Sequence, residues 1–299
     1  MFPSRFRYEA PRSLDEAIGL LHDGGDYVKV LAGGQSLVPM MKLRFASPEL
    51  LVDINNVPGL DYLRADPDGT LRIGALCRHA DLEFSDLLPG TQPTMAAAAP
   101  LVADPLVRNR GTLVGSLCHA DPQGDWASVM LALGGSVIAQ GPGGRRSIPL
   151  TEFVTGPFEN ALGYDEVAVE AVVPPAKGVR AGGYLKLERR VGDFATVGVA
   201  VAIETAGAGA GASVVRAGIA LTGVGGSTIG ATDAAAALAG QALTAETIGE
   251  AAELAAAAAQ PRTDHRGTAE YKRQLVRVFV KRLLSRSGPA GAEDAERAA

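Results

Sequence analysis

The amino-acid sequence predicts a mixed α+β fold divided into more than one domain. Its 299 residues leave room for two or three domains of ~100 to 200 residues each. Apolar residues make up 47% of the chain and charged residues 20%, proportions typical of a folded globular protein. Strand and helix patterns alternate in the first part of the chain, and three strands followed by three helices close it. This order favours α/β units joined to a separate sheet with helices.

Charge and cysteine content exclude several functional classes. Lys and Arg total 28 against 33 Asp and Glu, a net charge of -5, so the molecule as a whole does not attract nucleic acid or anionic lipid. Cys77 and Cys118 form no CxxC pair and lack metal-ligand spacing to any histidine. We therefore predict neither a metal site nor an iron–sulfur cluster in this chain. Without a signal peptide or ~18 consecutive apolar residues, it is expected to be cytoplasmic, with no transmembrane segment.

The N-terminal part is predicted to form a small βαβ-like unit. Residues 6–9 are extended, and Ser13 with Glu16 forms a capping box in which each side chain satisfies the other's free amide. A helix with apolar residues at helical spacing follows. Two further strands are expected at 28–32 and 50–54.

The middle of the chain is predicted to mix helices with hairpins. Asp121 before Pro122 predicts a helix start, because Asp accepts free amides at the N-cap and proline suits the first helical position. The glycine-rich residues 141–144 predict a hairpin turn between strands at 136–139 and 146–149.

The last part is predicted to be a sheet followed by helices. Three strands are expected, at 184–190, 195–204 and 213–222, and three helices, at 233–238, 245–259 and 268–286. The remaining residues are small and acidic, which predicts a disordered tail.

Several common cofactor and catalytic motifs are missing. The chain contains no GxGxxG, no GxxxxGK[ST] and no GxSxG. This disfavours a Rossmann-type dehydrogenase, a phosphate-loop ATPase and a nucleophile-elbow hydrolase.

Two glycine-bearing turns are candidate binding sites. The first turn, residues 32–36 (Ala-Gly-Gly-Gln-Ser), ends a strand, so its amides can form a nest for an anion. Its small residues also let the backbone approach a pyrophosphate closely. The second turn, residues 110–116 (Arg-Gly-Thr-Leu-Val-Gly-Ser), is rich in the residues that surround phosphate oxygens. Taken alone, the first turn is more typical of an ordinary tight turn, and the second is also a weak signal.

Four ordered segments that include these turns resemble a known family. They are AGGQSLVPMMKLR at 32–44, LVDINNVPGL at 51–60, VRNRGTLVGSLCHADPQGD at 107–125 and YLKLERRVGDFATVGVAVAIE at 184–204. In these segments the chain resembles the FAD-binding medium subunit of the molybdenum hydroxylases, the family of carbon monoxide dehydrogenase and xanthine dehydrogenase. The resemblance extends to about residue 286.

The resemblance implies a particular α+β architecture. It is a vanillyl-alcohol-oxidase-like (PCMH-type) FAD-binding fold of two α/β lobes plus a C-terminal three-stranded sheet with a helix bundle. The implied boundaries are an N-terminal FAD-binding lobe at 1–57, a second FAD-binding lobe at 58–177, the C-terminal sheet and bundle at 178–286 and a disordered tail at 287–299.

The resemblance also implies which residues bind FAD. Residues of both turns would hold the pyrophosphate, Asp125 matches an acidic residue after the second turn, and Lys186 matches a lysine near the flavin. Phe194 would cover a flavin face or pack in the core. The implied cofactor-binding set is Val30, Leu31, Ala32, Gly33, Gly34, Gln35, Ser36, Leu37, Val102, Thr112, Val114, Gly115, Ser116, Asp125, Lys186 and Phe194. No catalytic residue and no metal ligand is implied in this chain.

Val114 departs from the family pattern. The second turn usually carries Gly-Gly where this chain has Val114 and Gly115. If position 114 needs a positive φ, valine would be strained by roughly 1 to 3 kcal/mol. A slightly shifted loop that still binds FAD is the alternative.

The function implied by the resemblance is electron transfer. A large partner subunit would oxidise the substrate at a molybdenum cofactor, and a small one would carry two [2Fe-2S] clusters whose electrons reach the FAD of this chain and then an external acceptor. The complex would be a dimer of heterotrimers. Two alternatives stay open: an FAD-free scaffold subunit and a self-contained flavin oxidase of the same fold superfamily. The substrate is set in another chain.

Two other features have more than one interpretation. His119 follows the second turn and would contact a phosphate or flavin edge, or simply pack as a polar residue. Residues 262–286 hold eight Lys and Arg against two acids. Without a nucleic-acid motif, this basic stretch indicates a solvated or subunit-facing surface.

Overall fold

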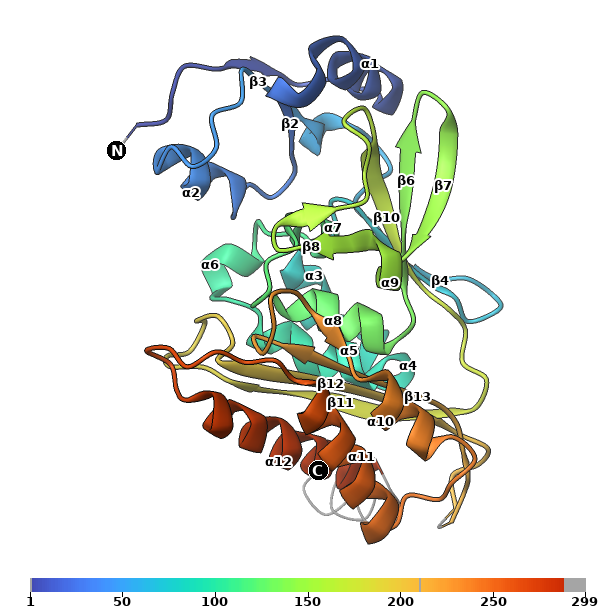
Figure 1. Cartoon of the computed structure of the whole chain (residues 1–299). Helices are drawn as coiled ribbons and strands as arrows, with labels where there is room; N and C mark the ends of the chain where they lie inside the picture. Colours follow the sequence, from blue (N-terminus) through green and yellow to red (C-terminus); the bar gives the residue numbers. More distant parts are fainter. Residues whose placement is uncertain (1, 210, 288–299) are drawn as a thin grey trace.

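Three large sheets with their helices follow one another along the chain. The computed structural model describes residues 2–209 and 211–287. The first sheet lies at the top of Figure 1, the second sheet in the middle, and the third sheet with the last helices at the bottom. No helix within these residues is both long and apolar enough to cross a membrane.

The first sheet confirms the predicted βαβ-like unit, because its strands are parallel in the order β1-β3-β2. Its elements are β1 (Arg7–Glu9), α1 (Leu14–Gly24), η1 (Gly25–Tyr27), β2 (Val28–Leu31), α2 (Leu37–Lys42), β3 (Leu50–Asp53) and η2 (Ile54–Asn56). The predicted capping box is half formed. Ser13 Oγ accepts from Glu16 N, but Glu16 Oε2 accepts from Arg12 N instead of Ser13 N.

The second sheet is antiparallel in the order β4-β5-β10-β6-β7. Its strands are β4 (Leu63–Ala65), β5 (Leu71–Gly74), β6 (Ser136–Gly141), β7 (Gly144–Pro149) and β10 (Val167–Val173), with the small hairpin β8 (Val154–Gly156) and β9 (Glu159–Asn160) beside it. The accompanying helices are α3 (His79–Glu83), α4 (Leu88–Thr91), α5 (Pro93–Ala98), η3 (Ala99–Leu101), α6 (Pro105–Arg108), α7 (Leu113–His119), α8 (Asp125–Ala132) and α9 (Leu150–Phe153). The β6–β7 pair confirms the predicted hairpin.

The prediction of a helix start at Asp121 is wrong. Asp121 Oδ1 accepts from Gln123 N at 2.8 Å, and Asp121 O accepts from Gly124 N at 2.9 Å. The aspartate therefore closes a turn instead of capping a helix. Helix α8 begins at Asp125, after Gly124. Asp125 is therefore the first residue of the helix and does not lie one turn further in, as a start at Asp121 would require.

The third sheet has four strands within the described residues, where three were predicted. The order is β11-β12-β13-β14, all antiparallel: β11 (Val179–Leu187), β12 (Val197–Thr205), β13 (Val214–Thr222) and β14 (Ile229–Gly230). The extra strand has two residues, too short to produce a periodic pattern in the sequence. Helices α10 (Thr232–Leu238), α11 (Ala245–Ala258) and α12 (Ala269–Ser287) follow. Ser287, predicted to begin the disordered tail, ends α12; residues 288–299 lie outside the described part.

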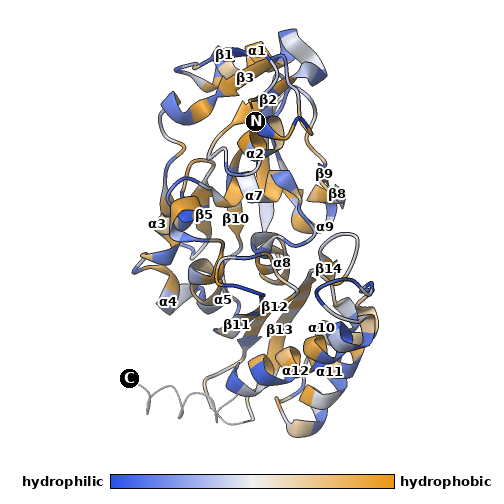
Figure 2. Ribbon diagram, turned by 90° about the vertical axis from the view of Figure 1, so that its left-hand side faces the viewer, coloured by the Kyte–Doolittle hydropathy of each residue, from blue (hydrophilic) through white to orange (hydrophobic). Residues whose placement is uncertain are grey.

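Strand β12 is buried on both faces. Val197, Val199 and Val201 pack with the three C-terminal helices in one core, whereas Ala200 and Ala202 belong to the core shared with the first two sheets. Figure 2 shows hydrophobic and hydrophilic residues alternating around α11 and α12, as expected of helices that bury one face. The small residues let α5 and α8 pack closely on the third sheet, which places β11 residues beside the start of α8.

Candidate functional site

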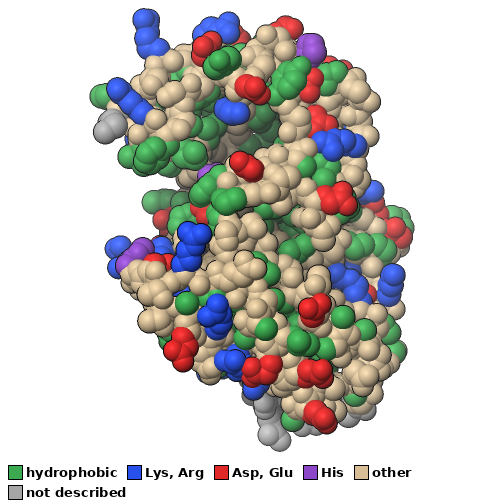
Figure 3. Space-filling view, viewed as in Figure 1, with side chains coloured by type: hydrophobic (Ala, Val, Ile, Leu, Met, Phe, Trp, Pro, Cys, Tyr) green, Lys and Arg blue, Asp and Glu red, His purple; other side chains and the backbone are tan. Residues whose placement is uncertain are grey.

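The two predicted turns lie in direct contact. A Cβ added to Gly33 would collide with Arg110 O and lie 2.8 Å from Gly111 Cα. Only glycine fits there, because both neighbours are backbone atoms that cannot rotate away. In Figure 3 the surface is hollowed below the part built on the first sheet, with hydrophobic side chains along the upper rim. Segments 78 residues apart, Gly33 and Gly111, thus form one site.

The first turn presents free backbone donors. The N–H groups of residues 34–37 have no hydrogen-bond acceptor among the described residues. The amides that follow are bonded, because Val38 N donates to Gly34 O and Met40 N donates to Ser36 O. Gly34 has a φ of 73° and Ser36 lies in the right-handed region. Left- and right-handed residues within one short turn direct neighbouring amides to one side, as in a nest for an anion.

The second turn begins helix α7. Thr112 is its N-cap, and its side chain accepts from Gly115 N at 3.1 Å. A Cβ on Gly115 would lie 2.7 Å from Thr112 Oγ1, so glycine allows the cap to form. A Cβ on Gly124 would lie 3.9 Å from Ser116 Oγ, which places Ser116 beside the start of α8.

Val114 is not strained. It lies in α7, is 2% exposed, and is not among the non-glycine residues with positive φ, which are Arg44, Ala103, Ala120 and Phe158. The valine is therefore an ordinary core residue at the start of a helix.

Restoring the family pattern with Val114→Gly is expected to destabilise the protein without improving FAD binding. The variant loses the burial of a valine side chain and gains a helical glycine, a cost of about 2 to 4 kcal/mol. Urea unfolding measures the stability and a fluorescence titration measures the FAD affinity. Tighter binding at unchanged stability would show that the valine does distort the turn.

A buried ionic cluster lies where α8 meets β11. Lys186, whose side chain is 2% exposed, donates to Asp125 Oδ2 at 3.1 Å and to Leu101 O at 2.9 Å, and it lies 3.3 Å from Glu188 Oε2. The Tyr184 hydroxyl donates to Asp125 Oδ1 at 2.6 Å. Burial raises the pKa of Asp125, against the opposing effect of Lys186. Two carboxyl groups thus share one ammonium.

Glu188 carries an unused acceptor. Its Oε2 is buried and makes no hydrogen bond to any described residue, although Lys186 Nζ lies at ion-pair distance. Its one charged neighbour among the described residues is therefore Lys186, and it can accept a hydrogen bond from a further donor. Free amides at the turns and a buried acceptor in this cluster suit a ligand with an anionic centre and a hydrogen-bonding ring. The residues present therefore fit FAD.

Val30, Leu31 and Val102 lie next to the first turn or the Lys186 cluster, whereas Phe194 lies at the surface. Val30 and Leu31 end β2 and lead into the first turn. Val102 is buried and follows Leu101, the carbonyl partner of Lys186. Phe194 is 50% exposed, and its backbone carbonyl oxygen accepts a hydrogen bond from Arg266 Nη1 at 2.7 Å. The expectation that Phe194 covers a flavin face remains a prediction, whereas its alternative place in the core is wrong.

His119 packs as an aromatic residue. Its ring lies 5.2 Å from that of Phe158, measured between centroids, and burial lowers its pKa. A neutral ring gives little attraction for a phosphate, so the structure favours the packing alternative.

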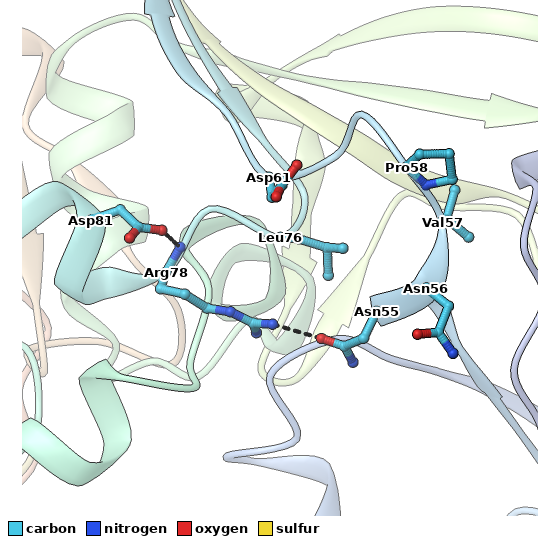
Figure 4. A pocket seen from close by; sticks show the side chains of 8 residues that line it. All are labelled: Asn55, Asn56, Val57, Pro58, Asp61, Leu76, Arg78 and Asp81. Carbon is cyan, nitrogen blue, oxygen red and sulfur yellow. Dashed lines mark hydrogen bonds between the residues drawn. The ribbon is translucent and has the colours of Figure 1, made fainter.

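Sequence analysis did not identify two polar residues beside the turns, Asn55 and Arg78. They line a cavity of about 400 Å³ together with Asn56, Asp61, Leu76 and Asp81, and Figure 4 shows the Arg78 guanidinium extended toward the Asn55 side chain. Asn55 lies inside the LVDINNVPGL segment that carries the family resemblance, which was a usable signal. Arg78 lies in none of the four segments.

Two family models together match nearly the whole chain. The first, "FAD binding domain in molybdopterin dehydrogenase", matches residues 4–176. The second, "CO dehydrogenase flavoprotein C-terminal domain", matches residues 183–287.

Individual relatives agree with these matches. The chain is 41% identical to the carbon monoxide dehydrogenase medium chain of Hydrogenophaga pseudoflava, over 95% of this chain and 98% of that one. It is 39% identical to the 6-hydroxypseudooxynicotine dehydrogenase complex subunit alpha of Paenarthrobacter nicotinovorans, over 96% of each. A solved structure of the Hydrogenophaga pseudoflava carbon monoxide dehydrogenase matches with a TM-score of 0.90 and 42% identity, over 97% of this chain and 99% of that one.

Proposed function

The chain belongs to the FAD-binding medium subunits of molybdopterin-dependent hydroxylases such as carbon monoxide dehydrogenase and xanthine dehydrogenase, and from this premise we propose how it works. It is an oxidoreductase subunit that holds FAD in a multi-subunit complex of the carbon monoxide dehydrogenase type. We propose that it takes electrons from [2Fe-2S] clusters in a small partner subunit and passes them to an external acceptor.

The single observation that carries the proposal is the contact between the two turns beside the buried cluster. The free amides of the first turn would bind the pyrophosphate through charge-assisted hydrogen bonds. The Lys186 cluster includes Asp125, the first residue of α8, and Ser116 of the second turn lies beside Gly124 just before it. We propose that this cluster holds the flavin ring. Bound FAD supplies one- and two-electron chemistry, while the protein supplies position and charge.

The cysteine count supports the division of labour between subunits. Two [2Fe-2S] clusters with all-cysteine ligands need about eight cysteines, and this chain has two. Burial raises the pKa of both Cys77 and Cys118 to about 12, which makes them poor metal ligands. We place the clusters and the molybdenum cofactor in two partner subunits, in a dimer of heterotrimers in the cytoplasm.

The finer fold assignment is part of the proposal. We assign the first two sheets to a vanillyl-alcohol-oxidase-like, PCMH-type fold with an N-terminal FAD-binding lobe at 1–57 and a second at 58–177, and the third sheet with its helices to 178–286. The separate packing of the last three helices in their own core supports the final boundary. The FAD-free scaffold alternative loses its one indication, because Val114 is unstrained.

The test is direct electron transfer between purified subunits. The FAD-loaded chain is mixed with a dithionite-reduced, desalted [2Fe-2S] subunit, and flavin absorbance is followed in a stopped-flow instrument. We expect the flavin to be reduced only in the presence of the reduced partner. The chain alone should oxidise no aldehyde, purine or carbon monoxide. Turnover of any of these by the chain free of molybdenum and iron would establish the self-contained oxidase instead.

A further inference from the structure

A polar bridge connects the two turns through Asn55 and Arg78. Arg78 Nη2 donates to Asn55 Oδ1 at 2.6 Å, and Asn55 Nδ2 donates to Ala32 O at 2.8 Å. Arg78 Nη1 donates to Arg110 O at 2.6 Å. The bridge therefore begins at the first residue of the first turn and ends at the first residue of the second turn.

On one side, the bridge is fixed to the second turn. His79 N donates to Gly111 O at 2.9 Å, so the backbone next to Arg78 is bonded to the same turn as its side chain. Arg78 N also donates to Asp81 Oδ2 at 2.7 Å, which holds the start of α3. The guanidinium thus extends from a backbone that moves with the second turn.

On the other side, the bridge is fixed to the first sheet. Asn55 N donates to Asp53 Oδ1 at 2.9 Å, and the Tyr8 hydroxyl donates to Asp53 Oδ2 at 2.6 Å. Burial opposes ionisation of Asp53, yet the hydrogen bonds from Tyr8 and Asn55 leave its pKa lowered. A charged carboxylate at the end of β3 therefore orients Asn55 toward Ala32.

Arginine suits this place because its planar fork reaches two acceptors at once. Lysine would offer one compact ammonium and could not hold both distances in the same geometry. Both bridge residues are half-buried and border the cavity of about 400 Å³, so they are not part of the apolar core that stabilises the fold. Their contribution is to the relative placement of two backbone segments.

We propose that Arg78 and Asn55 are positioning residues that set the spacing of the two turns for the FAD pyrophosphate. The inference rests on the proposed function, in which that pyrophosphate lies between the turns. Neither residue touches reacting atoms. Without the bridge, the turns lose the side-chain hydrogen bonds that connect Ala32 O to Arg110 O, and their amides no longer converge on one diphosphate.

A double-mutant cycle tests the bridge. FAD dissociation constants are measured by fluorescence titration for the apo forms of the wild type, Asn55→Ala, Arg78→Met and the double variant, with thermal unfolding of each apo protein alongside. We expect each single variant to weaken FAD binding by about tenfold, or 1.4 kcal/mol. The double variant should be no weaker than the singles, because either change removes the same bridge.

Two further variants keep the test decisive. Arg78→Lys retains the charge, yet we expect it to bind FAD about as weakly as Arg78→Met. Arg146→Met is the matched control, since Arg146, like Arg78, joins a side-chain oxygen to a backbone carbonyl, here Glu166 to Ala161 O, on an exposed hairpin. It should bind FAD like the wild type.

Three results would overturn the inference while leaving the proposed function intact: unchanged affinity in both single variants, additive losses in the double variant, or wild-type affinity in Arg78→Lys. Affinity losses that merely follow equal losses of apo-protein stability would assign the bridge to folding alone. Failure of the wild type to bind FAD would overturn the proposed function as well, so the two failures are distinguishable.

Discussion

Replacing Gly33 by alanine is expected to remove FAD binding almost completely. The new Cβ would collide with Arg110 O and approach Gly111 Cα to 2.8 Å, so the two turns must separate. Loss of two or more charge-assisted hydrogen bonds of roughly 1.5 to 3 kcal/mol each corresponds to a fall in affinity of about 100-fold or more. The φ of Gly33 is not positive, so alanine is not strained by its own backbone, and the effect is due to the contact.

Gly19→Ala is the matched control for this substitution. Gly19 lies within α1 of the same sheet unit, and a Cβ there would meet nothing within 4 Å. Alanine should raise stability by up to about 1 kcal/mol, because it favours the helix, and should leave FAD affinity unchanged. A Gly33→Ala protein that binds FAD as the wild type does would show that the turns need not be in contact.

Lys186→Met is expected to give a large loss of stability. It leaves Asp125 and Glu188 buried without their shared ammonium, and breaking a buried ion pair in this way costs roughly 3 to 5 kcal/mol. The cost should depend on pH. Asp125 already has a raised pKa in the folded protein, so its ionisation lowers stability as pH rises through that value.

Removal of Lys186 raises the pKa of Asp125 further. The stability gap between the variant and the wild type should therefore narrow as the pH is lowered toward 5 and widen at pH 8, measured by thermal unfolding. Lys281→Met, on the exposed face of α12, serves as the control and should show neither effect. An equally stable Lys186→Met protein at pH 8 would mean that the cluster is neutralised by protons instead of by the lysine.

The fold could be predicted from the sequence wherever local patterns determine it. The βαβ order of the first sheet, the hairpin of β6 and β7 and the three C-terminal helices all follow from periodicity and turn residues. Two errors have local causes as well. Asp121 bonds to Gln123 N and closes a turn, and the two-residue strand β14 exists only because it pairs with β13, which no local pattern reveals.

The candidate site was predictable in its backbone part and not in its side-chain part. The glycines of the two turns are visible in the sequence, because close approach of backbone demands them. The link through Arg78 is not visible, because it depends on the tertiary placement of α3 beside the second turn. Lys186 was expected to lie near the flavin. Its ion pairs with two carboxylates could not be predicted, because they depend on the packing of α8 on β11.

A crystal structure of the chain with FAD bound tests the central claim most directly. We expect the pyrophosphate to accept hydrogen bonds from the amides of residues 34–37, between the first and second turns, with the ring directed toward Lys186 and Glu188. The Arg78–Asn55 bridge should remain intact in that structure. A pyrophosphate bound away from both turns, for example in the cavity lined by Asn56 and Asp61, would contradict the account.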